Sequence, residues 1–321
     1  MTRRPEAGPA YTGARYAASL AEFGTPVHLP RSGGWLLERP VPGTALRDLT
    51  GPYPLFACRD WSGLGADLDE LEGAAVSVVL VPDPLSGVPV DLLRTAFRDH
   101  VTPFKQHLVR ELATAVPLTS SHRRHVRRAL RSVEVEVVAD PLRHLDDWVR
   151  LYGHLVGRHR LTGVRAFSVE AFRQQLALPG LVAVRAERDG VTVCMTLWLV
   201  GGENAYYHLG ASSDAGREVS ASYAVFAIAL DHLRDRGVRY VDLGGVAGAE
   251  HRDDGLSRFK GGWANAERVA HLCGRILDRP SYTALTALAP AAGRWFPAYR
   301  AGDRDPSGQV RAAEETRGVV T

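Results

Sequence analysis

Three strand patterns followed by a helix and a fourth strand constrain the fold most. In chain order these elements cover 181–188, 191–200, 205–212, 221–236 and 238–245. Asp189-Gly190, between the first two strands, favours a tight hairpin. The helix is apolar almost all round in its first half and ends at Gly237, which predicts a buried element. Strands and helix are therefore expected to pack as one unit.

The first part of the chain has shorter patterns of both kinds. They predict helices at 14–23, 66–71 and 90–99 and strands at 27–30, 35–39, 54–58, 74–82 and 104–112. The strand at 74–82 is apolar and β-branched enough to be buried on both faces. The fold class expected is α/β of the α+β type, with mixed twisted sheets flanked by helices.

The pattern restarts near Asp140-Pro141, which indicates a domain boundary. Helices at 142–157 and 169–178 follow it, and a strand at 267–278 and a helix at 280–290 close the pattern. A length of 321 residues suits two domains of ordinary size. We expect them at 13–140 and 141–300, with flexible tails at 1–12 and 301–321.

The spacing of the cysteines and the hydropathy of the chain indicate where in the cell the protein is found. Cys58, Cys194 and Cys273 occur singly, without CxxC spacing, so neither a disulfide framework nor a metal site is indicated. The N-terminus is polar, and no apolar run is long enough to span a membrane. We expect a cytoplasmic protein. A net charge of +3 permits an anionic partner but is too small to indicate a DNA-binding protein.

Lysine is rare in this chain. Of 39 lysines and arginines only Lys105 and Lys260 are lysines, which leaves 39 − 2 = 37 arginines. Lysine carries a compact amine that can be partly desolvated, whereas the arginine fork is always charged. The two lysines are therefore candidates for positions where an arginine would not serve. Lys260 follows a strand that ends in Gly244-Gly245, and we expect a glycine-rich turn to present it.

The helix predicted at 121–132 holds the densest positive charge, and Thr119 or Ser120 can cap it. Its arginines are Arg123, Arg124, Arg127, Arg128 and Arg131. Helical spacing places most of them along one flank, which suits a phosphate-bearing ligand or RNA. A solvated helix face explains the same pattern, so both interpretations stay open.

The order of elements from 206 to 245 resembles the acyltransferase fold of the GNAT superfamily. Four segments resemble more narrowly the FemABX peptidoglycan-bridge aminoacyltransferases and the BioF2-like acetyltransferase domains. They are Asp242-Leu243-Gly244-Gly245, Gly255-Leu256, Arg258-Phe259-Lys260 and Gly261-Gly262-Trp263. The likeness covers roughly 104–277 and implies two GNAT-like domains in tandem, with the donor site in the second. It also implies aminoacyl-tRNA as donor.

Two departures from the family patterns bear on the substrates. The [Q/R]xxGx[G/A] motif that binds the CoA pyrophosphate aligns with 217–222, where serines stand at the glycine positions. Amides at the N-terminus of the following helix could still bind an anion. Acyl-CoA and aminoacyl-tRNA therefore both stay open as donors. The long helical arm of several bridge-forming enzymes is missing, so a peptidoglycan acceptor is not implied.

The resemblance and the residue chemistry together predict the site. Lys260 is expected to stabilise the oxyanion or hold the donor, and Asp242 either to activate the acceptor amine or to cap the Gly-Gly turn. The expected donor-binding residues are Arg217, Ser220, Ala221, Ser222, Tyr223, Gly244, Gly245 and Phe259. The expected acceptor-binding residues are Lys105, Arg124, Arg127, Arg128, Tyr207 and Trp263. Tyr207 and His208 are adjacent strand positions, so only one can face the cleft.

These features predict an N-acyltransferase that moves an aminoacyl or acyl group to an amine by direct attack in a ternary complex. No Ser-His-Asp order and no HExxH motif offers a covalent or metal route. No tightly bound cofactor is expected, and the acceptor is a small-molecule or cell-wall-precursor amine. One alternative is an acetyl-CoA-dependent N-acetyltransferase of a metabolite or sugar amine. Another is a non-catalytic RNA- or nucleotide-binding protein on the same scaffold.

Overall fold

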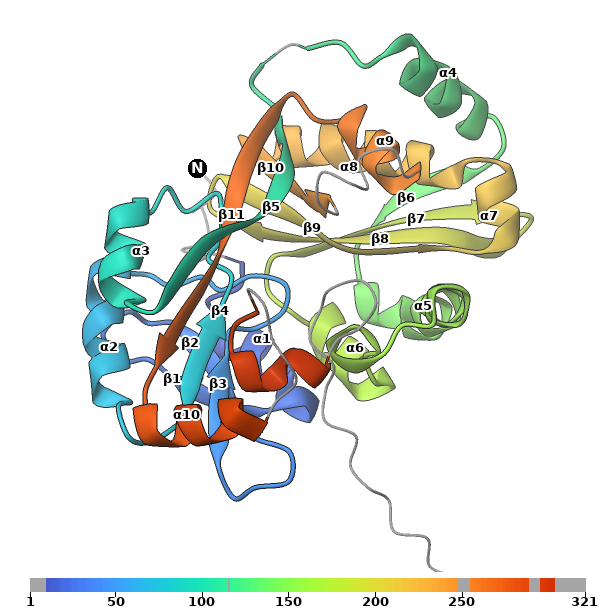
Figure 1. Cartoon of the computed structure of the whole chain (residues 1–321). Helices are drawn as coiled ribbons and strands as arrows, with labels where there is room; N and C mark the ends of the chain where they lie inside the picture. Colours follow the sequence, from blue (N-terminus) through green and yellow to red (C-terminus); the bar gives the residue numbers. More distant parts are fainter. Residues whose placement is uncertain (1–9, 115, 247–254, 289–294, 304–321) are drawn as a thin grey trace, which may run out of the picture.

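One mixed sheet runs through both halves of the molecule in the computed structural model (Figure 1). The structure describes residues 10–114, 116–246, 255–288 and 295–303. Within them the sheet has eleven strands in the order β1-β2-β3-β4-β11-β5-β10-β9-β8-β7-β6. The predicted class, a mixed twisted sheet flanked by helices, is confirmed, and the two halves of the chain share that sheet.

The first half of the sheet is built mainly from residues before 112. Its strands are β1 (Thr25–His28), β2 (Trp35–Pro40), β3 (Arg47–Thr50), β4 (Ser77–Leu80), β5 (His100–Glu111) and, from the end of the chain, β11 (Ala266–Ile276). Its helices are α1 (Ala14–Ala18), α2 (Leu64–Glu70), α3 (Val90–Ala96), α10 (Arg279–Leu288) and the 3-10 helix η6 (Ala298–Asp303).

The second half follows β5. Its strands are β6 (Glu134–Val138), β7 (Leu181–Arg188), β8 (Val191–Gly201), β9 (Asn204–Ser212) and β10 (Tyr240–Val246). Its helices are α4 (Ser120–Ala129), α5 (Leu145–His159), α6 (Val169–Leu176), α7 (Asp214–Glu218), α8 (Ala221–Asp235) and α9 (Gly255–Gly261). No helix in the described part of the chain is long and apolar enough to cross a membrane.

Local sequence explains the hairpin and the buried helix of the second half. Asp189 and Gly190 join β7 to β8 with φ of 52° and 77°, and a tight hairpin needs this pair of positive values. Gly237 ends α8 with φ of 81°, a value that glycine adopts without strain. The predicted hairpin and helix end are both confirmed.

Helices cover both faces of the second half. On one face α8 packs against β8, where the rings of Trp198 and Phe226 lie 5.0 Å apart. On the other face α5 and α6 pack together, with Trp148 and Phe172 5.7 Å apart at their contact. All four aromatic side chains are at least 97% buried, so each face carries its own apolar core.

β9 and β10 run parallel but pair over only three residues each. Tyr240–Asp242 of β10 pair with Asn204–Tyr206 of β9. Farther along, β10 pairs only with β5, where Gly245 faces His107. The two strands therefore separate after Tyr206 and Asp242, and α8 connects the end of one with the start of the other.

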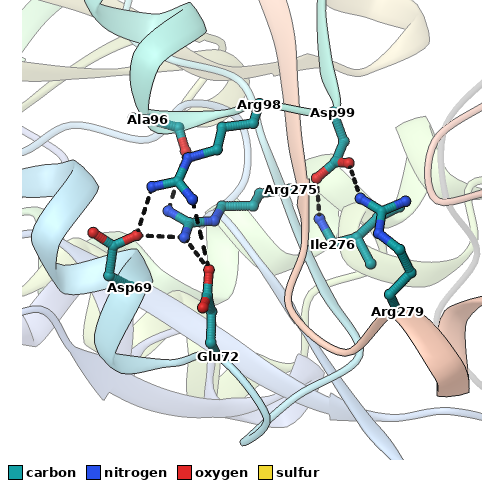
Figure 2. Close-up of polar contacts among 8 residues, drawn as sticks. All are labelled: Asp69, Glu72, Ala96, Arg98, Asp99, Arg275, Ile276 and Arg279. Carbon is teal, nitrogen blue, oxygen red and sulfur yellow. Dashed lines mark hydrogen bonds and ion pairs between the residues drawn. The ribbon is translucent and has the colours of Figure 1, made fainter.

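The last strand, β11, lies between β4 and β5 in the first half of the sheet. Its Arg275 is 1% exposed and donates to the carboxylates of Asp69 and Glu72, as Figure 2 shows. Arg98 joins them and lies 2.9 Å from Asp69. A buried guanidinium without such carboxylates would cost several kcal/mol of stability. These ion pairs and the strand ladders together fix β11 within the first half.

The start of the described chain differs from the prediction. Tyr11 and Thr12 fall in the expected flexible tail, yet they are 2% and 3% exposed. The ring of Tyr11 packs edge-on against Tyr16 and Tyr206, 5.0 and 5.1 Å away. Aromatic contacts therefore correct the predicted end of this tail. Residues 1–9 and 304–321 lie outside the described residues.

The segment before the predicted boundary at 140 packs with the second half. β6 pairs antiparallel with β7, and α4 lies against α8. The chain thus passes from the first half to the second between β5 and α4, rather than after β6 as the predicted boundary would require. The division of the chain into two domains stays a prediction.

Candidate active site

A cavity of about 750 Å³ lies where the two halves of the sheet meet. Its polar lining from the second half and β5 consists of Lys105, His107, Tyr206, Tyr207, His208, Asp242 and Lys260. Gly244 and Gly245 of β10 line it as well. The cavity therefore includes the point at which β9 and β10 separate. Its volume is in the range of small-molecule binding sites.

A bulge in β10 shapes this part of the cavity. Asp242 faces Val109 of β5 and Gly245 faces His107, so β10 has one more residue than β5 between these pairs. Gly244 lies in the bulge with φ of 87°, a conformation that favours glycine. The bulge explains why the strand needs a glycine here.

Lys260 approaches the bulge from α9. Its amine would lie 3.0 Å from a Cβ atom on Gly244, so a side chain at that position would push the amine away. The amine also lies 5.8 Å from the centre of the Tyr207 ring, within the range of a cation–π contact. Lys260 is 8% exposed. The prediction of a glycine-rich turn around Lys260 is wrong, because 255–261 form a helix.

Asp242 both caps the bulge and binds a histidine. Its Oδ1 accepts a hydrogen bond from the Gly244 N–H at 2.7 Å, and its Oδ2 lies 2.8 Å from Nδ1 of His107. The sequence left open whether Asp242 is a base or a turn cap, and the geometry shows the capping contact. Asp242 and His107 are 2% and 6% exposed, so the pair is shielded from bulk water.

His107 is a functional candidate that the sequence reasoning missed. An ionised carboxylate only accepts hydrogen bonds, so in a neutral His107 ring the contact with Asp242 places the proton on Nδ1 and leaves a lone pair on Nε2. That Nε2 atom would lie 3.1 Å from a Cβ atom on Gly245. Lys105 and His107 are two residues apart on β5, so both lie on one face of the strand. This spacing was the sequence signal that could have identified His107 as a site residue.

Lys105 lies beside the same glycine. Its Cδ atom would be 3.0 Å from a Cβ on Gly245, so the absence of a side chain there gives both Lys105 and His107 room. Burial lowers the pKa of the Lys105 amine, and the nearby charge of Arg165 lowers it further. Because Gly244 and Gly245 have no side chains, Lys260, Lys105 and His107 can all lie beside this stretch of β10.

Tyr207 and His208 point to opposite faces of β9, as alternation predicts. Both nevertheless line the cavity, so the prediction that only one of them faces it is wrong. The ring of Tyr207 lies 4.8 Å from that of Phe226, on the side of α8. His208 has Nε2 3.2 Å from Gln175 Oε1 on α6, and burial lowers its pKa to about 3. A histidine held neutral in this way has a structural role. Tyr206, on the same face as His208, donates to Asp83 at 2.5 Å.

Three predicted site residues form an aromatic cluster outside the cavity lining. Tyr223 and Phe259 lie 4.9 Å apart and edge-on, and Trp263, 1% exposed, packs beside them. His122 of α4 joins the cluster, and its Nε2 lies 2.9 Å from the carbonyl oxygen of Phe259. A Cβ atom on Gly262 would lie 1.8 Å from the His122 ring. The cluster therefore docks α4 onto α8 and α9.

The residues aligned with the pyrophosphate motif lie at the junction of α7 and α8, outside the cavity lining. The guanidinium of Arg217 pairs with Asp214 and donates to the carbonyl of Ser212 at 3.4 Å. Ser220 has φ of 59°, and Ala221 is fully buried. Ser222 follows in the first turn of α8. Their role in donor binding stays a prediction.

The basic helix α4 presents its arginines to solvent. The Thr119 hydroxyl caps it by accepting the His122 N–H at 3.2 Å, as predicted. The five predicted arginines are all exposed. A surface hollow of about 380 Å³ is lined by Ser120 and by four of these arginines, namely Arg123, Arg124, Arg127 and Arg131. Arg128 is exposed but lies outside this hollow. α4 therefore presents a positively charged surface apart from the cavity, and its role in binding stays a prediction.

Comparison with known proteins agrees with this geometry. A family model described as an acetyltransferase (GNAT) domain matches residues 120–260, somewhat under half of the chain. That range includes β9, α8, β10 and Lys260. Residues 120–260 thus resemble a GNAT domain, and the chain as a whole resembles FemX in fold. No curated protein sequence matches it.

The FemX crystal structure has a TM-score of 0.65 and 17% identity, and the alignment covers 84% of this chain and 93% of FemX. The C-terminal domain of a candidate lysylphosphatidylglycerol synthetase from Agrobacterium fabrum has a TM-score of 0.60 and 15% identity. That alignment covers 85% of this chain and 90% of the domain. L-PGS from Bacillus licheniformis has a TM-score of 0.55 and 13% identity, and the alignment covers 85% of this chain and 94% of L-PGS. These likenesses extend over nearly the whole of each chain and establish a common fold.

Proposed function

We propose that this GNAT-fold acyltransferase moves an aminoacyl or acyl group from an activated ester to an amine by direct attack in a ternary complex. One observation carries the proposal: the Lys260 amine and the His107–Asp242 pair meet beside Gly244 and Gly245 in one cavity. Direct transfer needs an oxyanion stabiliser and a proton acceptor at such a point.

Lys260 supplies the positive charge. When the acceptor nitrogen attacks the carbonyl carbon, negative charge develops on the carbonyl oxygen. A lysine ammonium fixed by surrounding packing stabilises that oxygen without having to reorganise. Its amine lines the cavity beside the backbone of Gly244. This arrangement supports the oxyanion role.

His107 receives the proton. The acceptor amine loses a proton as the new C–N bond forms and the bond between carbonyl carbon and donor oxygen or sulfur breaks. With Nδ1–H donated to Asp242, Nε2 of His107 can take that proton and pass it to the leaving group. Asp242 is then a positioning residue, a role that we propose instead of the base role that the sequence left open for it.

The donor we favour is an aminoacyl-tRNA. The exposed arginines of α4 suit an RNA backbone, and serines replace the glycines that usually approach the CoA pyrophosphate. Two of the structural neighbours carry the name lysylphosphatidylglycerol synthetase or L-PGS, which supports aminoacyl transfer as a class. The acceptor is an amine on a small molecule or cell-wall precursor. An acyl-CoA donor is the alternative.

Labelled donors test the proposal. The full chain is incubated with radiolabelled aminoacyl-tRNA or acetyl-CoA and a panel of amines, comprising a lysyl peptide, glucosamine and a cell-wall precursor. Transfer that RNase abolishes supports the tRNA donor, and transfer from acetyl-CoA that RNase leaves intact supports the alternative. RNA binding without any acylated product would contradict catalysis and favour a non-catalytic RNA-binding protein. In that case, replacing Arg124, Arg127 and Arg128 by Ala should abolish binding.

A further inference from the structure

A second cationic group lines the same cavity on the side of β2 and β3. Arg300 of η6 donates from Nε and Nη2 to the two oxygens of Asp48, at 2.5 and 3.1 Å. Nη2 also donates to the carbonyl of Pro40 at 2.7 Å. Arg300 and Asp48 are 2% and 1% exposed. This ion pair is fully formed within the protein.

Arg39 shares the same carboxylate. It is the cross-strand neighbour of Asp48, and its Nη2 lies 3.3 Å from Asp48 Oδ1. The hydroxyl of Tyr299 also donates to Asp48, at 3.0 Å. Two guanidinium groups thus face one carboxylate. Burial lowers the pKa of Arg39, and the charge of Arg300 adds to that effect.

The Arg39 guanidinium has unused hydrogen-bond donors. Its Nε and Nη2 are buried and make no hydrogen bond of good geometry within the described part of the chain, although Nη2 takes part in the ion pair with Asp48. Its side chain is 13% exposed and lines the cavity. Burying an arginine with an incomplete set of acceptors is costly, and an added anion would offset that cost. An arginine with incomplete hydrogen bonding at the wall of a cavity is typical of a residue that binds an anion.

We propose that Arg39 binds an acidic group of the acceptor, a carboxylate or a phosphate, while the acceptor's amine lies near Lys260. This inference rests on the proposed function. β2 and β10 are separated by five strand spacings, or about 24 Å along the sheet. Pro52, Tyr53, Phe104 and Leu272 line the same cavity and supply apolar walls. The acceptor class is therefore an extended amine with an acidic group far from the amine.

Anion binding to the full chain tests this site without any donor or turnover. Inorganic phosphate and succinate are titrated by calorimetry into the wild type, Arg39→Gln and Arg47→Gln. Arg47 is the matched control, because it lines the same cavity but is half-exposed and lies 3.5 Å from Glu38. We expect the wild type to bind one of the anions, with affinity falling about tenfold or more in Arg39→Gln. Arg47→Gln should bind within about twofold of the wild type.

The anion that binds distinguishes a phosphate from a carboxylate on the acceptor. Failure of the wild type to bind either anion would overturn the site, and so would equal affinity in Arg39→Gln, which would assign binding to the arginines of α4. Unfolding by urea is the second measurement. Arg39→Gln should unfold at the same or a higher urea concentration, since it removes an unsatisfied charge, and a lower midpoint would contradict a binding role. These results are independent of the transfer assay, so either proposal can fail alone.

Discussion

The amine of Lys260 lies 3.0 Å from the point where a Cβ atom on Gly244 would stand. This relationship explains two features of the sequence together. Gly244 forms the bulge in β10 with a positive φ, and it leaves the space that the Lys260 side chain enters from α9. The glycine and the lysine are therefore parts of one site.

Gly244→Ala should abolish transfer while costing little stability. The new methyl group would displace the Lys260 amine, and the positive φ would cost about 1 kcal/mol of unfolding free energy. Gly237→Ala is the matched control, since φ there is 81° and a Cβ would meet nothing within 4 Å. Urea unfolding should show similar losses in both variants, with activity lost only in the first. Loss of activity in both would assign the effect to strain alone.

His107→Gln should reduce kcat by a factor of about 10² to 10⁴, the usual contribution of a general base. Asp242→Asn should reduce it too, because the amide no longer fixes the Nδ1–H tautomer of His107. A folded His107→Gln variant that keeps the wild-type kcat would remove His107 from the mechanism.

Acid should destabilise the protein through His208. Burial lowers its pKa to about 3, from an unfolded value near 6.5. The stability that neutral His208 contributes is complete above about pH 6.5 and is lost as the pH falls toward 3. Between pH 7 and pH 5 the wild type should lose about 2 kcal/mol more than His208→Gln, as measured by urea unfolding. Equal losses would show that His208 is accessible to protons in the native state.

Gly262→Ala should loosen the docking of α4. A Cβ at this position would lie 1.8 Å from the His122 ring, which holds α4 against the carbonyl of Phe259. We expect a loss of about 1–3 kcal/mol of unfolding free energy, typical of overpacking. Gly261→Ala is the control, because a Cβ there meets nothing within 4 Å. A similar unfolding midpoint in the two variants would show that α4 docks without this contact.

Local patterns predicted most of the second half. Asp189-Gly190 and Gly237 determine a hairpin and a helix end through backbone conformation, which depends on a few neighbouring residues. The strand expected at 54–58 is wrong, since only Phe56 forms a bridge there, with Pro82. β3 was missed because its RDLT sequence is polar, and its Asp48 is buried by pairing with arginines from distant segments.

The site was less predictable, because it depends on tertiary contacts. Glycines around Lys260 suggest a turn, yet Phe259 packs 4.7 Å from the ring of Phe226, and this contact accompanies a helix. His107 and Asp242 are 135 residues apart, and only the adjacency of β5 and β10 joins them. Sequence spacing could place Lys105 and His107 on one face, but it could not show what that face meets.

The role of Lys260 is tested most directly by the turnover of Lys260→Met, which keeps the length of the side chain and removes the charge. Arg258→Met, exposed on the same helix, is the control. We predict that Lys260→Met lowers kcat by a factor of about 10² to 10³, as loss of an oxyanion-stabilising group does. Its unfolding midpoint should be similar to that of the control. Wild-type turnover by a folded Lys260→Met variant would contradict the account.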